Sequence, residues 1–86
     1  MTPGTIAHVE AEIWRTEQRV FDLHDDLVEV LEATEVVIRF NPPGADRMLS
    51  LLRKERSLIR QQQAIYLEGL EDLDETRRLL LQAEND

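Results

Sequence analysis

The chain has 86 residues, no cysteine and a formal net charge of −8, with 42% apolar and 33% charged residues. This length supports one small domain, and the absence of cysteine excludes disulfides and thiolate metal sites. The acidic balance disfavours binding to nucleic-acid phosphates and to anionic membranes, while the apolar content is too high for a disordered acidic tail. No stretch approaches the roughly 20 apolar residues of a membrane span. The N-terminal residues do not form a signal peptide, so a cytoplasmic location is expected.

The first predicted element is a helix over about 5–40. Apolar residues and two threonines recur there at alternating steps of three and four, which is typical of a coiled-coil seam. The helix is expected to begin at Thr2, as an N-cap before Pro3, or at Thr5. The ten seam positions are Ile6, Val9, Ile13, Thr16, Val20, Leu23, Leu27, Val30, Thr34 and Val37.

A second apolar stripe lies on the same helix. Trp14, Phe21 and Val28 recur every seven residues, one position after the seam, and Leu31 and Ile38 extend the stripe. A single neighbouring helix cannot cover both stripes, so this width is typical of a helix with at least two neighbours in a bundle.

The predicted turn covers residues 41–44, where the sequence reads Asn-Pro-Pro-Gly. Because the residue before a proline is disfavoured in helical geometry, the first helix should end near Phe40. Asn41 is predicted to be the N-cap of the next helix, with Pro42 at its first helical position.

The second predicted helix covers about 45–84. Leu52, Ile59, Tyr66, Leu73 and Leu80 recur every seven residues. The intervening seam positions are predicted to be Glu55, Gln62, Gly69 and Thr76, and a polar residue in a seam commonly fixes register and oligomer state. Gly69 is expected either to allow close backbone approach or to mark a kink.

Folding back at the turn places two residues of the two arms opposite each other when their residue numbers add up to 86. Ile13 then meets Leu73, and Leu27 meets Ile59. The basic stretch 47–60 lies opposite the acidic stretch 22–35, which favours the antiparallel pairing. The sequence therefore predicts an all-α chain. It further predicts that residues 1–86 form one antiparallel helical hairpin, coiled-coil-like, and that this hairpin dimerises into a four-helix bundle.

Two surfaces are candidate binding sites. Large aromatic side chains commonly anchor protein interfaces, and a lone hairpin has no third helix to cover its second stripe. The predicted oligomer or partner interface comprises Trp14, Phe21, Val28, Leu31, Leu51, Leu58 and Ile65. An acidic face at the open end of the hairpin comprises Glu68, Glu71, Asp72, Asp74 and Glu75. This acidic face serves either solubility or docking to a basic protein.

The remaining residues give little support for a metal site or a catalytic site. His8 and Glu12 share a helix face, but neither histidine has the Glu-x-x-His spacing of helical di-iron sites. The basic residues from Arg53 to Arg60 resemble the set of chorismate mutase-like enzymes, yet the arginine expected near residues 31–35 and a second helix break are missing. No metal, cofactor or catalytic residue is therefore predicted.

The sequence favours a non-enzymatic interaction module, a self-associating hairpin that acts in assembly or as an adaptor. A homo-oligomer is expected, with a dimer favoured. The alternative is a small acidic chaperone or inhibitor that binds a basic partner, including as a nucleic-acid mimic, and a small helical enzyme is the least favoured hypothesis.

Overall fold

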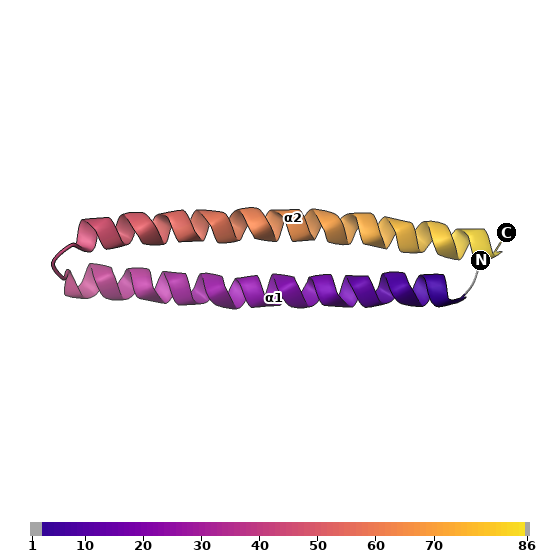
Figure 1. The fold of residues 1–86 in the computed structure, drawn as a ribbon, viewed down its shortest axis with the longest axis horizontal. Helices are drawn as coiled ribbons and strands as arrows, with labels where there is room; N and C mark the ends of the chain where they lie inside the picture. Colours follow the sequence, from indigo (N-terminus) through magenta and orange to yellow (C-terminus); the bar gives the residue numbers. More distant parts are fainter. Residues whose placement is uncertain (1–2, 86) are drawn as a thin grey trace.

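The computed structural model describes residues 3–85 as two helices, α1 (Pro3–Phe40) and α2 (Ala45–Asn85). They lie side by side and antiparallel, joined by one tight turn (Figure 1). The molecule measures 66 × 14 × 13 Å. The predicted all-α antiparallel hairpin is confirmed. Thr2, one of the two expected starts of the first helix, lies outside the described residues.

Asn41 terminates α1, and its predicted role as the N-cap of the next helix is wrong. Its φ of 43° is left-handed, a conformation that asparagine tolerates at the end of a helix. Its N–H donates to the Val37 carbonyl over 2.9 Å. Gly44, at φ 80°, precedes α2 instead, and its carbonyl accepts the N–H of Met48 over 3.1 Å.

The seam of α1 is confirmed at all ten predicted positions. Val9 and Thr16 are buried, and the other eight are half-buried. Thr16 fits in the seam because its hydroxyl donates to the Glu12 carbonyl over 2.8 Å, and Thr34 donates in the same way to Val30. These bonds satisfy the hydroxyls within their own helix and leave the methyl groups available for packing.

The seam of α2 differs from the prediction at every second step. Glu55, Gln62 and Thr76 are exposed. After Leu52, and again after Ile59, Tyr66 and Leu73, the next seam residue lies four positions further along the chain and not three. Gly69 is half-buried beside the seam, and a Cβ placed on it would meet nothing within 4 Å. It therefore allows no close backbone approach within the chain. The seam residues are Ala45, Leu49, Leu52, Arg56, Ile59, Gln63, Tyr66, Leu70, Leu73, Arg77 and Leu80.

The two seams are in register along the whole hairpin. We call a residue of α1 and a residue of α2 level with each other when their residue numbers add up to 86. With this rule every seam residue of α1 is level with a seam residue of α2, from Ile6 with Leu80 to Val37 with Leu49. Thr34 and Leu52, which are level, line the same surface depression. The predicted register therefore agrees with the buried positions.

This hairpin has a thin core. Among the described residues the buried apolar side chains are Val9, Ala45 and Ile59, and Ile59 is the most enclosed, with 4% exposed. The radius of gyration is 19.4 Å, against about 12 Å for a compact domain of this length. Two helices in contact along one seam leave most of their surface in solvent.

Candidate interaction surface

The exposed large apolar side chains of the described residues form two rows along the hairpin. A spacing of seven residues returns a side chain to the same side of a helix. The outermost edges, opposite the seams, are polar and carry residues such as Asp25 and Glu32 on α1 and Lys54 and Glu68 on α2. The exposed apolar side chains are Trp14, Phe21, Val28, Leu31, Val36, Ile38, Phe40, Met48, Leu51, Leu58, Ile65, Leu67, Leu79 and Leu81.

The first row defines what we call the Trp14 flank. Trp14 is 63% exposed and Phe21 60% exposed, so their own hairpin leaves most of each residue uncovered. Ile38 lines a depression with Arg53 and Arg56, which places this side of α1 beside the arginine-bearing side of α2. The apolar members of the Trp14 flank are Trp14, Phe21, Val28, Leu31 and Ile38 from α1 and Leu67 and Leu81 from α2.

The second row, the Ile65 flank, lies on the opposite side of the hairpin. Asp26, Glu29 and Ala33 of α1 line a depression with Glu55 of α2, which marks this side. Its apolar members are Val36 and Phe40 from α1 and Met48, Leu51, Leu58, Ile65 and Leu79 from α2. The seven residues predicted as one interface are therefore divided: four lie on the Trp14 flank, and Leu51, Leu58 and Ile65 lie on the Ile65 flank.

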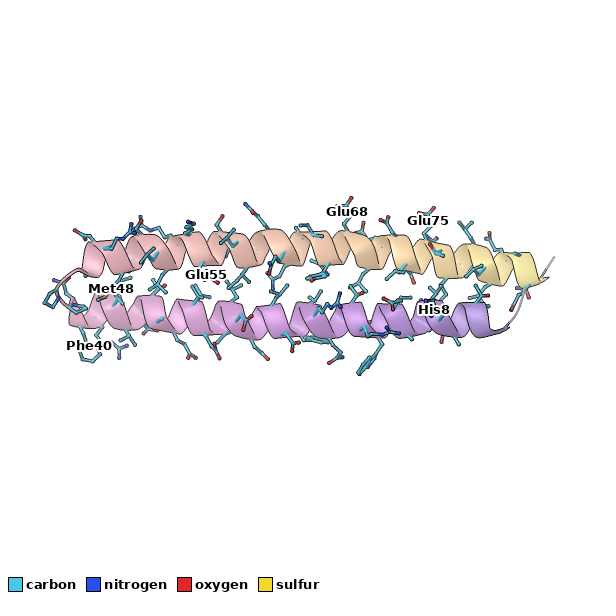
Figure 2. The ribbon with its side chains drawn as sticks, in the orientation of Figure 1. His8, Phe40, Met48, Glu55, Glu68 and Glu75 are labelled. Atoms are coloured by element: carbon cyan, nitrogen blue, oxygen red, sulfur yellow. The ribbon has the colours of Figure 1, made fainter. Side chains whose placement is uncertain are left out.

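The five residues of the predicted acidic face are distributed around three sides of α2. Glu68 and Glu75 project from its outer edge, away from α1 (Figure 2). Glu71 and Asp74 lie on the Trp14 flank, and Asp72 lies on the Ile65 flank, as their offsets from the seam require. The structure brings these carboxylates to one end of the hairpin but does not place them on one face.

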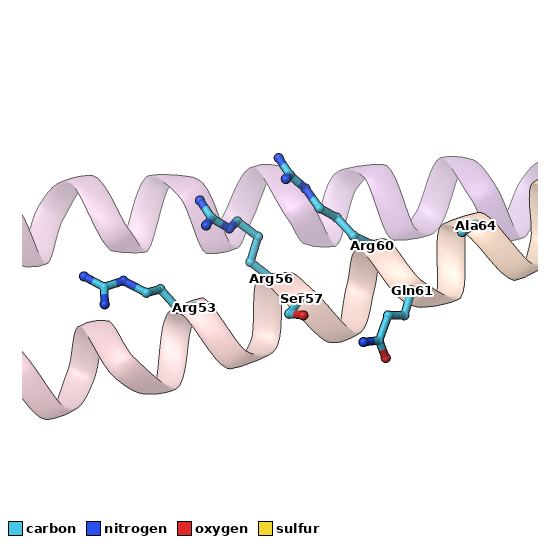
Figure 3. A pocket seen from close by; sticks show the side chains of 6 residues that line it. All are labelled: Arg53, Arg56, Ser57, Arg60, Gln61 and Ala64. Carbon is cyan, nitrogen blue, oxygen red and sulfur yellow. The ribbon is translucent and has the colours of Figure 1, made fainter.

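A cluster of three arginines was not predicted as a surface. Arg53, Arg56 and Arg60 line one shallow depression on the Trp14 flank with Ser57 and Ala64 (Figure 3). Within residues 3–85, none of the three forms an ion pair. Their spacing of three and four residues is the sequence signal that identifies the cluster.

Ion pairs occur within each helix and not between the helices in the part of the chain that the structure describes. Arg15 pairs with Glu12 over 2.7 Å, Arg39 with Glu35 over 2.8 Å, and Arg77 with Asp74 over 2.5 Å. The basic stretch 47–60 therefore forms no close ion pair with the acidic stretch of α1 in the described residues, and the expectation that charge favours the fold-back stays a prediction. A cation-π contact does cross the hairpin: the Arg19 guanidinium lies 5.7 Å from the centre of the Tyr66 ring.

The histidines lie on the surface. His8 and His24 are both exposed. Across residues 3–85 no three histidine or carboxylate side chains gather closely enough to hold a metal ion. Over the same range neither helix has an apolar segment sufficient to cross a membrane. The two apolar flanks, the arginine cluster and the acidic open end are therefore the surface features that can support binding.

Comparison with known protein families, with curated proteins and with solved structures gave no match. The functional argument therefore depends on the geometry of the hairpin.

Proposed function

We propose that this protein is a self-associating helical hairpin that works by binding, as an assembly or adaptor module, and not by catalysis. The observation that carries the proposal is the pair of exposed apolar flanks. Large exposed apolar side chains that gather along one side of a molecule are typical of interaction sites.

The amount of exposed surface supports association. The chain exposes 6618 Å², whereas a compact monomer of 10.0 kDa exposes about 5,200 Å². The excess is about 1,400 Å² per chain, larger than the roughly 800 Å² that each partner contributes to an interface of standard size. A dimer that removed this excess would belong with the large interfaces of obligate homodimers.

Sedimentation equilibrium at micromolar concentration tests the proposal. We expect a mass of two chains for the natural protein. Replacing both Trp14 and Phe21 with alanine should weaken association by about 30-fold or more per anchor, because truncating an anchor residue costs about 2 kcal/mol or more. A matched variant, Gln18→Ala with Glu32→Ala on the outer edge of α1, should remain dimeric. A folded monomer for the natural chain at micromolar concentration would reject self-association.

The acidic open end of the hairpin favours a second candidate function, binding to a basic protein surface. Residues 3–21 and 65–85 carry nine acidic against four basic side chains. A lysine-rich peptide is a suitable probe. Its binding should weaken with salt, and it should be lost when Glu71, Asp72, Asp74 and Glu75 become amides. Equal loss on neutralising four acids nearer the turn, Asp22, Asp25, Asp26 and Glu29, would show that net charge alone acts.

A further inference from the structure

We infer that the half of the Trp14 flank nearest the turn binds a helix of another protein, one that carries an acidic row beside an apolar row. The site consists of the arginine cluster on α2 and of the apolar residues Val28, Leu31 and Ile38 on α1. The inference goes beyond self-association, because the partner is a different chain that is recognised by its carboxylates.

The arginine cluster has no carboxylate partner on its own helix. None of its three side chains forms an ion pair within residues 3–85. The nearest acids on the same flank of α2 are Asp46, seven residues before Arg53, and Glu71, eleven residues after Arg60. Like charges at steps of three and four residues destabilise a helix slightly, so an anionic partner would be favourable here.

The acids of α1 do not compensate the cluster either. Among residues 22–35 only Glu35 lies on the Trp14 flank, and it pairs with Arg39 over 2.8 Å. The other acids of this stretch lie on the outer edge of α1 or on the Ile65 flank, as their offsets from the seam require: Asp22, Asp25, Asp26, Glu29 and Glu32. The site is therefore locally basic in a chain of net charge −8.

Apolar side chains of α1 lie beside the arginine cluster. Val28 and Leu31 are on the same flank, within the levels that the cluster spans, and both are more than a third exposed. Ile38 lines one depression with Arg53 and Arg56, so apolar and basic side chains share a surface there. A third helix laid along this side of the hairpin would contact both rows at once.

The spacing of the cluster matches one face of a helix. Arg53, Arg56 and Arg60 lie at steps of three and four residues, so they follow α2 for about 10 Å. Their side chains extend in one direction, toward the side on which α1 lies (Figure 3). Carboxylates at the same steps on a partner helix form a matching row. Guanidinium groups bind carboxylates through two parallel hydrogen bonds, which adds geometric specificity.

Two other anionic ligands fit this site less well. Small-molecule sites are concave and enclose most of their ligand, whereas this depression is shallow and lies on a helix surface. A nucleic acid would be repelled by a chain of net charge −8, since its affinity depends on neutralising phosphates with basic residues. Neither ligand would use the apolar row of α1, whereas an amphipathic helix uses both rows.

Fluorescence anisotropy with a designed peptide tests the site. The probe is a labelled helical peptide of about 18 residues, long enough to span the cluster, with a row of leucines beside a row of glutamates. A second peptide carries glutamines in place of the glutamates. We expect the natural chain to bind the glutamate peptide about tenfold more tightly, because several exposed ion pairs are gained. This preference should decrease with salt.

Paired charge variants locate the binding. Arg53→Gln with Arg60→Gln should weaken binding of the glutamate peptide about tenfold, because two ion pairs are lost. The control is Arg47→Gln with Lys54→Gln on the outer edge of α2, which makes the same change in net charge. It should leave the affinity within about twofold, since salt screens charges that make no contact. Each variant is first checked for helical content.

The apolar row has a matched pair of its own. Ile38→Ala should weaken binding about fivefold, because the apolar area that the peptide covers becomes smaller. Val36→Ala is the control, since Val36 is also more than half exposed but lies on the Ile65 flank. Equal effects of these two substitutions would show that the peptide does not lie beside the cluster, and would overturn the inference.

Several other results would also overturn it. They are equal loss for the two charge variants, equal affinity for the two peptides, no saturable binding at ~1 mM peptide, and tighter binding of an oligothymidine of similar length. Loss of self-association in Arg53→Gln with Arg60→Gln would overturn it too, because the cluster would then belong to the contact between copies.

Sedimentation equilibrium without peptide separates this inference from the proposed self-association. A monomeric natural chain that binds the glutamate peptide would remove self-association and support the site. A dimer that binds no peptide would leave self-association standing and overturn the site.

Discussion

Gln63 provides a stringent test of where the α2 seam runs. Residues 61–63 are three consecutive glutamines, but only Gln63 is turned into the seam, half-buried and level with Leu23. Gln61 is exposed near the outer edge. We predict that Gln63→Leu stabilises the hairpin and that the same substitution at Gln61 does not.

The magnitude follows from the burial at each position. Burying a leucine side chain completely is worth about 1.5–3 kcal/mol relative to leaving it exposed. At a half-buried position the gain from Gln63→Leu should be about 1 kcal/mol, which corresponds to a rise in Tm of about 4–8 °C for a domain of this size. At the exposed position of Gln61 the change should stay within about 0.5 kcal/mol.

Thermal unfolding followed by circular dichroism measures this difference. Both variants and the natural chain must be compared at one protein concentration, because association shifts the apparent Tm by mass action. Equal shifts for the two variants, or a larger shift for Gln61→Leu, would show that the α2 seam does not pass through residue 63.

Three further predictions address the core and the glycines. Ile59→Ala should lower the free energy of unfolding, measured with urea, by about 3 kcal/mol, because Ile59 is the most enclosed apolar side chain of the described residues. Leu58→Ala, at a position 46% exposed, should lower it by less than about 1 kcal/mol. Similar losses for the two variants would contradict the burial pattern. Gly69→Ala should raise the free energy of unfolding by about 1 kcal/mol, since it lies within a helix with open space around a Cβ, and a loss of stability would indicate a contact made in the assembly. Gly44→Ala should lower the free energy of unfolding by about 1 kcal/mol because Gly44 has a left-handed φ; an unchanged denaturation midpoint would show that the turn relaxes to accept the side chain.

The arrangement of α1 was predictable because its seam is chemically uniform. Eight of its ten positions are aliphatic, and the other two are threonines whose hydroxyls are satisfied within the helix. The double proline at 42–43 fixed the position of the fold-back, since neither residue can extend the preceding helix. Together these features predict the register from the sequence alone.

The second half of the chain was harder to predict because its seam includes Arg56, Gln63 and Arg77. Long polar side chains can bury their stems and keep their heads in water, so a hydropathy pattern does not distinguish Arg56 from the neighbouring Glu55. Leu49 and Leu70 were the available signal, because each lies on the seam that passes through Arg56 and Gln63. The prediction of Asn41 as an N-cap was wrong for a related reason, because asparagine is favoured both before a helix and after one.

The division of the predicted interface between two flanks follows from antiparallel geometry. The Trp14 stripe lies one residue after the seam of α1, while the stripe of Leu51, Leu58 and Ile65 lies one residue before the seam of α2. In antiparallel helices these offsets point to opposite sides of the pair. Position relative to the seam, and not apolar character alone, decides which exposed residues can share a partner.

Level residues of the two arms always have numbers that add up to 86, so the hairpin can change its length and keep its pairing. Removing residues 17–23 together with 63–69 takes one heptad from each arm, and every remaining pair of levels is kept. The rod then shortens by about 10 Å, given a rise of 1.5 Å per residue. Taking the same heptad from one arm alone would leave an unmatched overhang. Insertions or deletions of matching heptads in both arms therefore change the length of the rod and keep the contacts between the two seams.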